Sequence, residues 1–125
     1  MTKHGGATRT RCPVESVIRL IGGRWKCLIL FHLRHRTLRF SELRRSLPGI
    51  TQRMLTLALR ELEDGGLVQR TVYAEVPPRV EYQLTARGRT MEPILVAMKE
   101  WGERYERELQ ELTPDPVVIP LRAQG

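Results

Sequence analysis

Residues 41–66, "SELRRSLPGITQRMLTLALRELEDGG", contain two helical patterns with a short break between them. In the first pattern Leu43 and Leu47 are spaced i, i+4, and Ser41 is a suitable N-cap residue. The letters "PGI" interrupt this pattern, Thr51 is a suitable cap for the second helix, and the glycine pair ends it. Two helices joined by a turn of about three residues that contains a glycine are typical of a helix-turn-helix.

The second helix has an apolar face and a mostly polar face. At about 100° per residue, the face that we expect in the core contains Leu55, Ala58, Leu59 and Leu62. The opposite face and its flank contain Gln52, Arg53, Thr56, Leu57, Arg60 and Asp64. With Thr51, the polar residues of the N-terminal half supply donors and acceptors of the kind that read base edges. The exposed Leu57 suits a thymine methyl group, or it is simply solvated.

A hairpin pattern follows the second helix. Apolar and polar residues alternate from Val68 to Val76 and again from Val80 to Leu84, as in half-buried strands. Two prolines stiffen the loop between them, and Arg79 stands at its end, where a cation suits a narrow minor groove. The alternative is that this loop is only a solvated turn. The predicted fold is α+β and mostly helical, a winged helix-turn-helix with a two-stranded wing.

Basic residues are concentrated in the first half of the chain. Residues 1–60 hold 13 of the 21 Lys and Arg residues but only two acidic residues, a formal net charge of +11, whereas residues 61–125 carry −4. This asymmetry indicates a polyanionic partner such as nucleic acid, although a solvated basic surface is the simpler alternative. Arg44 and Arg45, in the first helix of the helix-turn-helix, are candidate phosphate ligands.

Two further apolar helices are predicted before the helix-turn-helix and another after the wing. "CPVESVIRLIGG" begins with Pro13 at a favourable first position, and "RWKCLILFHLRHR" is apolar nearly all round, as in a buried central helix. Thr85 is a suitable cap for the last helix, which Pro93 should kink or divide. Its apolar stripe includes Met98 and Trp101, and it has too little partner surface in one small domain, which predicts a homodimer.

The predicted organisation is one domain with two irregular ends. A disordered arm covers residues 1–11 and the domain covers 12–112, with the helix-turn-helix at about 41–64, the wing at about 67–84 and the dimer helix at about 85–112. The tail, 113–125, is expected to be irregular. No apolar signal core and no membrane-spanning run is present, so we expect a cytoplasmic protein whose two cysteines are thiols.

The sequence offers no recognisable enzyme chemistry. It lacks a glycine-rich phosphate loop, and its glycine pairs are expected at helix ends. His32 and His35 are three residues apart on a predicted helix, a spacing that can chelate a metal, but no third ligand is evident nearby. We therefore expect neither a catalytic site, nor a metal site, nor a cofactor.

Several separated motifs resemble the HxlR family of bacterial winged-helix transcription regulators. They are "CPVESVIRLIGGRWKCLIL", "RFSELRRSLPGITQRMLTLALRELEDGGLVQR", "VPPRVEYQLTARG" and "EWGERY", and they cover about residues 12–106. The resemblance implies a MarR-like dimer whose second helix of the helix-turn-helix enters the major groove and whose wing includes Arg79. It also implies that the first and last helices make the dimer contact, with the candidate residues Val14, Val17, Ile18, Ile94, Met98, Trp101 and Tyr105.

Cys12 is the one residue with a candidate chemical role. It lies at the predicted N-cap of the first helix, next to Arg11, where the helix start and a cation favour a thiolate. In the family that it resembles, a cysteine at this position senses oxidants or electrophiles in some members. The alternative is a small residue packed at a helix start. Cys27, in the middle of a helix, is expected to be buried and inert.

The leading hypothesis is therefore a homodimeric transcriptional regulator that binds a pseudo-palindromic operator in double-stranded DNA. An oxidant or a small molecule is a candidate effector, with Cys12 as either the sensor or a structural residue. Two alternatives stay open at this stage. One is a winged-helix module that binds protein or RNA, and the other is a metal-responsive repressor of similar fold.

Overall fold

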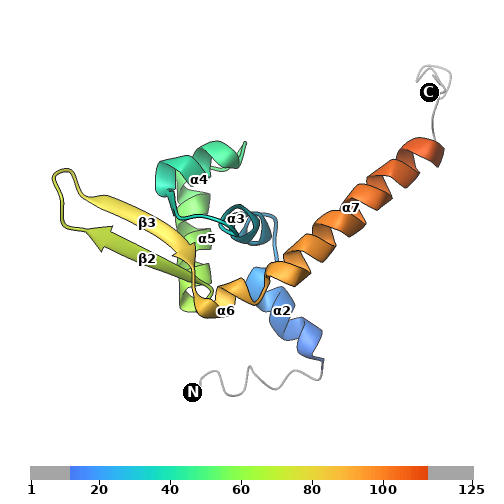
Figure 1. Ribbon diagram of the computed structural model, residues 1–125, viewed down its shortest axis with the longest axis horizontal. Helices are drawn as coiled ribbons and strands as arrows, with labels where there is room; N and C mark the ends of the chain where they lie inside the picture. The colour runs from blue at the N-terminus through green and yellow to red at the C-terminus, as the bar shows by residue number, and fades with distance from the viewer. Residues whose placement is uncertain (1–11, 113–125) are drawn as a thin grey trace, which may run out of the picture. The chain divides into compact units, whose positions relative to one another are not determined.

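Residues 12–112, which the computed structural model describes, form short helices, one long helix and a small sheet. The predicted arm and tail, 1–11 and 113–125, lie outside the described residues. A boundary between two compact units falls within the long helix, between Leu95 and Val96. In chain order the elements are α2 (Pro13–Ile21), α3 (Lys26–His32), β1 (Leu38–Arg39), α4 (Phe40–Ser46), α5 (Gln52–Asp64), β2 (Val68–Tyr73), β3 (Arg79–Leu84), α6 (Ala86–Arg89) and α7 (Glu92–Leu112) (Figure 1).

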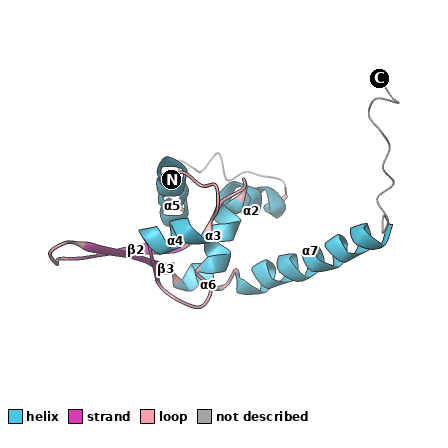
Figure 2. Cartoon of the chain, turned by 90° about the horizontal axis from the view of Figure 1, so that it is seen from above, coloured by secondary structure: helices cyan, strands magenta, loops and turns pink. Residues whose placement is uncertain are grey.

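The sheet has three antiparallel strands in the order β1-β3-β2, which are the predicted two-stranded wing and one short additional strand. β2 and β3 form the predicted hairpin, with Val68 opposite Leu84 and Tyr73 opposite Arg79. The hairpin extends away from α4 and α5, and Figure 2 shows it edge-on. The additional strand is the two-residue β1, which pairs with the other edge of β3. The stretch around β1 was predicted to be extended, but its partner lies more than 40 residues away, so the pairing has no local signal.

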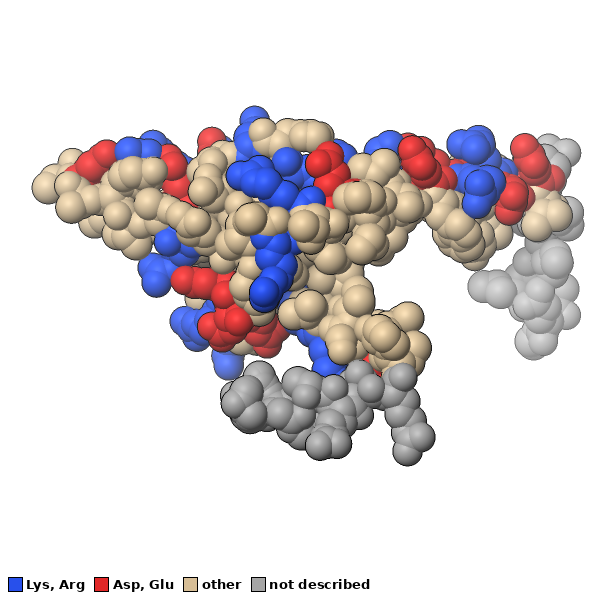
Figure 3. Space-filling view, turned by 60° about the horizontal axis from the view of Figure 1, so that its bottom comes forward, with Lys and Arg blue, Asp and Glu red and all other residues tan. Residues whose placement is uncertain are grey.

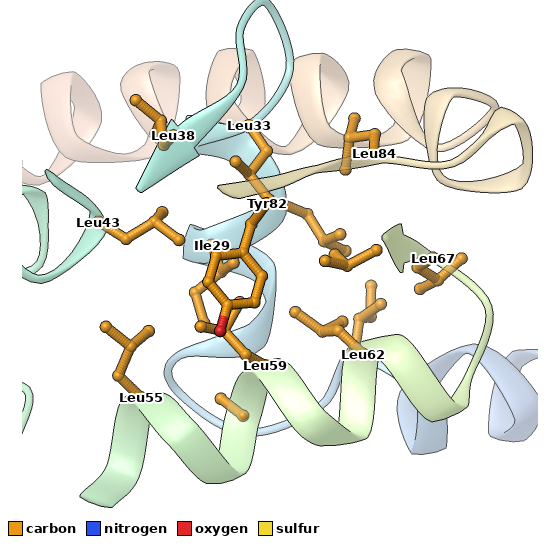
Figure 4. Close-up of a cluster of buried hydrophobic side chains, with 14 of the residues drawn as sticks. Ile29, Leu33, Leu38, Leu43, Leu55, Leu59, Leu62, Leu67, Tyr82 and Leu84 are labelled. Atoms are coloured by element: carbon orange, nitrogen blue, oxygen red, sulfur yellow. The ribbon is translucent and has the colours of Figure 1, made fainter. Parts of the chain in front are cut away.

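The core lies between α3, α5 and the base of the hairpin. Ile29 and Leu30 of α3 are fully buried, and Tyr82 and Leu84 of β3 cover them from the sheet. Figure 4 shows labelled side chains of α5 pointing at this cluster. The prediction from helical periodicity is confirmed, because all four residues of the expected inner face of α5 are buried: Leu55, Ala58, Leu59 and Leu62.

The helix starts agree with the predicted caps except at α4. Thr51 Oγ1 accepts a hydrogen bond from the Met54 N–H at 3.0 Å, as expected for the N-cap of α5. The predicted cap Ser41 is wrong, because α4 begins one residue earlier and Ser41 lies inside it. Instead, Glu42 Oε1 accepts a hydrogen bond from the Arg39 N–H at 2.7 Å, which satisfies the backbone at this helix start.

The central helix is shorter and less completely buried than predicted. α3 covers seven residues, and Leu28 on its surface is 41% exposed. Cys27 was expected to be buried, but it is only partly so, and this burial raises the pKa of its thiol. A continuous apolar run does not reveal which side of a short helix lacks a neighbour, so the sequence pattern overstates the burial of α3.

Close packing at Gly88 joins α6 to the sheet. A Cβ atom at this position would lie 2.2 Å from the backbone oxygen of Leu67, so no other residue fits without a backbone shift. Thr85 Oγ1 accepts a hydrogen bond from the Gly88 N–H at 3.0 Å, which confirms the predicted cap. The predicted division of the last helix is also confirmed, because α6 ends at Arg89 and Pro93 lies in the first turn of α7.

Candidate nucleic-acid interface

The turn between α4 and α5 places the start of α5 at the surface. Leu47 and Ile50 are buried on either side of the turn, while Pro48 and Gly49 are exposed. Gly49 has φ +93°, a backbone conformation that other residues rarely adopt, so this sharp turn requires a glycine. The turn leaves Thr51 and the first turn of α5 facing solvent.

The outer face of α5 is a surface of polar side chains around one exposed leucine. Gln52, Arg53, Leu57 and Arg60 are exposed, and Thr56 is half-buried beside them. These five residues line one shallow hollow along the helix, so the structure brings together the predicted base-reading residues. Within residues 12–112, neither arginine of this set forms an ion pair with a carboxylate.

Two other surface hollows lie on opposite flanks of this outer face. One is shared with the hairpin, where Thr56 and Arg60 lie beside Arg70 and Tyr82. An ion pair joins α5 to β2 on this flank, with 3.5 Å between Glu63 Oε1 and Arg70 Nε. The hollow on the other flank lies between Leu57 and the loop that joins α2 and α3, residues 22–25. This loop was not predicted to approach α5.

Arg44 and Arg45 lie in the last turn of α4, and both side chains are exposed. Neither forms an ion pair with a carboxylate in the part of the chain that the structure describes. Their positive charge is therefore available to an external anion. Their role as phosphate ligands stays a prediction.

The sequence predicted that Arg79 projects as a free cation from the tip of the wing. The structure shows that Arg79 is paired instead. It begins β3, and its Nη2 and Nε atoms lie 2.9 Å and 3.4 Å from the two carboxylate oxygens of Glu75. Its Nη1 atom also contacts Glu81, and its guanidinium lies over the Tyr73 ring at 3.9 Å. The hydrogen bond from Arg79 holds the pKa of Glu75 below its usual range, and both carboxylates raise the pKa of Arg79. Figure 3 shows acidic and basic side chains next to each other toward the left end of the view, where the hairpin lies.

The predicted dimer residues are mostly exposed. On α2, Val14 and Ile18 are 59% and 60% exposed, whereas Val17 is half-buried against the core of its own chain. On α7, Trp101 is 58% exposed and stacks on Tyr105, with 5.3 Å between the ring centroids. The other exposed large apolar residues of α7 are Ile94, Met98, Leu109 and Leu112.

Cys12 is exposed at the N-cap position of α2, as predicted, and Pro13 begins the helix. Arg11, the neighbour expected to favour the thiolate, lies outside the described residues. The structure thus places an accessible thiol at a helix start. The other cysteine, Cys27, is half-buried in α3.

Residues 12–112 contain no group of three His, Cys, Asp or Glu side chains that is able to hold a metal ion. His35 instead approaches a carboxylate of α7, with 3.9 Å between its Nε2 atom and Glu92 Oε2. Within the same range, no helix is long and apolar enough to cross a membrane.

These features define a winged helix-turn-helix protein. Residues 20–110 match the family described as HxlR-like helix-turn-helix. The uncharacterized HTH-type transcriptional regulator YybR of Bacillus subtilis (strain 168) is 59% identical over 107 residues, which cover 86% of each chain. The chain therefore belongs to the HxlR-like helix-turn-helix family, as its motifs predicted. It is a transcriptional regulator of the helix-turn-helix type and not an enzyme.

Solved structures of similar proteins agree with this assignment. The redox regulator HypR in its oxidized form is 58% identical, with a TM-score of 0.72, over 74% of this chain and 96% of that chain. In its reduced form HypR is 54% identical, with a TM-score of 0.76, over 80% and 99%. The reduced form of the transcriptional regulator YodB from B. subtilis is 34% identical, with a TM-score of 0.66, over 86% and 100%.

Proposed function

We propose that the protein is a homodimer that binds a pseudo-palindromic operator in double-stranded DNA, with α5 in the major groove. The observation that carries this proposal is the outer face of α5. It presents Gln52, Arg53 and Arg60 at the surface of a helix whose other side is anchored in the core. An α-helix of ~10–12 Å diameter fits the ~12 Å major groove of B-DNA.

The polar residues of this surface have different roles. Gln52 and Arg53 lie in the first turn of α5, from which a recognition helix contacts base edges. An arginine there pairs with guanine and a glutamine with adenine. Arg44 and Arg45 of α4 contact phosphates, which fixes the register of the protein without reading sequence.

Arg79 remains a candidate DNA ligand in the wing. To bind in a minor groove, its guanidinium must exchange the Glu75 and Glu81 carboxylates for the negative potential of the DNA. Arg79→Ala therefore removes both a DNA contact and a cluster that organises the hairpin end. If Arg79 contacts DNA, this variant binds the operator more weakly and with a shallower salt dependence. An unchanged affinity and salt dependence would limit Arg79 to a structural role.

A comparison of two arginine variants tests the recognition helix. Arg53→Ala is expected to lose about 1–3 kcal/mol of preference at one base position, whereas Arg44→Ala weakens binding to operator and unrelated duplex equally. Binding is measured by fluorescence anisotropy on duplexes from the region upstream of its own gene, after footprinting has located the site. Equal loss on all duplexes for Arg53→Ala would show that Arg53 contacts only phosphate.

The same assay separates DNA binding from the alternative functions. Competition by random duplex and by RNA, repeated at several salt concentrations, distinguishes a sequence reader from a general polyanion or RNA binder. A wild-type protein that binds no duplex DNA more tightly than RNA would contradict the proposal. Metal analysis of the purified protein and its effect on binding test the metal-responsive alternative.

The proposed dimer is supported by exposed apolar residues on two helices. Val14 and Ile18 of α2 and Trp101 and Tyr105 of α7 have large apolar surfaces open to solvent. Such surfaces on a small protein mark contacts with other chains. A two-fold dimer presents two copies of α5, which match two half-sites about one helical turn, ~34–36 Å, apart.

We further propose that oxidants regulate DNA binding through Cys12. The support is its exposed thiol at the start of α2 and the similarity of the chain to the redox regulator HypR. Because α2 also carries part of the proposed dimer surface, a modification at its start changes the contact between the two copies. This change then alters the spacing of the two recognition helices.

Diamide treatment of three proteins tests this role. Wild type, Cys12→Ser and the matched control Cys27→Ser are compared for DNA affinity before and after treatment. We expect that wild type and Cys27→Ser change affinity, while Cys12→Ser does not. Mass spectrometry and non-reducing electrophoresis identify the modified thiol and any disulfide between copies. A wild-type protein with modified Cys12 and unaltered affinity would refute the sensor role.

A further inference from the structure

The loop between α2 and α3, together with Lys26 at the start of α3, lies beside α5. Lys26 Nζ lies 3.3 Å from Glu61 Oε1 of α5, and it also donates a hydrogen bond to the backbone oxygen of Arg19 at 3.3 Å. Trp25 packs toward the turn of the helix-turn-helix, since a Cβ atom on Gly49 would lie 4.0 Å from Trp25 Cη2. These contacts fix the position of the loop relative to the recognition helix. The loop and α5 enclose a shallow groove lined by Gly22, Gly23, Arg24, Trp25, Lys26, Met54, Leu57, Ala58 and Glu61.

Arg24 holds an exposed cation at this groove. Its guanidinium carbon lies over the Trp25 ring, 4.3 Å from the ring centroid, which is a cation–π contact. This contact leaves N–H donors of the guanidinium free to bind a phosphate. No carboxylate pairs with Arg24 within residues 12–112, and Glu61, which lines the same groove, is already paired with Lys26.

Shared residues place Arg24 on the flank of α5 that is opposite the wing. Leu57 belongs both to the outer face of α5 and to the groove that contains Arg24. Thr56 and Arg60 belong both to the outer face and to the hollow that contains Arg70 of the wing. The outer face of α5 therefore lies between the loop that carries Arg24 and the hairpin.

We propose that Arg24 binds a phosphate of the DNA backbone that borders the major groove on the side of α5 away from the wing. This inference rests on the proposed insertion of α5 into the major groove. A helix that fills this groove has a sugar-phosphate backbone along each flank. The wing faces one of these backbones, and Arg24, which lies over Trp25 and is unpaired, faces the other.

A phosphate contact has a measurable signature that a base contact lacks. Arg24→Ala is expected to weaken binding about three- to tenfold, by a similar factor for the operator and for an unrelated duplex. The slope of log K against log salt should become shallower by about 0.9, the change for one phosphate contact. Arg24→Lys keeps the charge but loses the flat guanidinium group, so it should keep the slope and lose less affinity than the alanine variant.

The experiment measures fluorescence anisotropy of full-length wild type, Arg24→Ala, Arg24→Lys and Arg89→Ala on both duplexes at several potassium chloride concentrations. Arg89→Ala is the matched control, because Arg89 is an exposed arginine of α6 that lines none of the three surface hollows described above. Circular dichroism melts check that each variant is folded. Should the alanine variant fail to fold, Arg24→Gln replaces it.

The outcomes separate this inference from the proposed function. A wild-type protein that binds the duplexes, together with an Arg24→Ala variant whose affinity and salt slope match those of Arg89→Ala, would overturn the phosphate contact alone. A loss on the operator without a loss on the unrelated duplex would assign Arg24 to a base instead. A wild-type protein that binds neither duplex would overturn the proposed function, and the Arg24 contact with it.

Discussion

Trp101→Ala should weaken the proposed dimer strongly. The side chain is 58% exposed, and a buried aromatic side chain covers 150–250 Å², so roughly 90–145 Å² remains to be buried. At ~25 cal/mol per Å², this area contributes about 2–4 kcal/mol in each copy and about twice that in a two-fold interface. Ordering of the interface offsets part of this gain, which leaves an expected 10²- to 10³-fold increase in the dimer dissociation constant, or roughly 3–4 kcal/mol.

Sedimentation velocity over a range from submicromolar to tens of micromolar protein measures this constant. Glu100→Ala is the matched control, because Glu100 is the exposed neighbour of Trp101 and its loss removes little apolar area. In a Trp25→Phe background Trp101 is the only tryptophan, so a blue shift of its emission with rising concentration reports its burial directly. A wild-type monomer at micromolar concentration that still binds the operator, or equal dissociation constants for wild type and Trp101→Ala, would refute the reasoning.

Three further predictions concern packing, specificity and thiol reactivity. Gly88→Ala should lower the free energy of unfolding by about 1–3 kcal/mol, because the added methyl group overpacks the site. Gly102→Ala, in open space within α7, should raise the free energy of unfolding by about 0.5–1 kcal/mol. Urea denaturation measures both changes. Arg53→Ala should relax base preference at one operator position in a binding assay on randomised duplexes. Burial raises the pKa of Cys27, so little thiolate forms at neutral pH and more forms as the pH rises. Iodoacetamide should therefore modify Cys27 more slowly than the exposed Cys12 at neutral pH, which peptide mass spectrometry measures.

The fold was predictable where its signals are local. The inner face of α5 follows from helical periodicity, and the caps Thr51 and Thr85 follow from side-chain chemistry close to each helix start. The family motifs then gave the arrangement of these elements. The pairing of β1 with β3 was not predictable in this way, because a two-residue strand carries no period and depends on a distant partner.

In the candidate site too, the features with a local sequence signal were predictable and most of the others were not. The residues on the outer face of α5 were predicted because one helix presents them all. The environment of Arg79 was not, although Glu81 is two residues away on the same strand and thus on the same face of the sheet. That spacing and the opposite charges are the signal that was missed. The approach of Arg24 to α5 had no local signal, since it depends on how the loop packs against a distant helix.

The position of β3 in the middle of the sheet determines where the chain tolerates changes of length. A residue inserted into the loop at 74–78 lengthens only the connection beyond the paired residues of the hairpin. A residue inserted within 80–82 breaks the register with β2 and β1 together, and it turns Tyr82 or its neighbours from the core to the solvent. Relatives and engineered variants should therefore differ in length at the loop that ends the wing. The length of β3, which pairs with both β1 and β2, should stay constant.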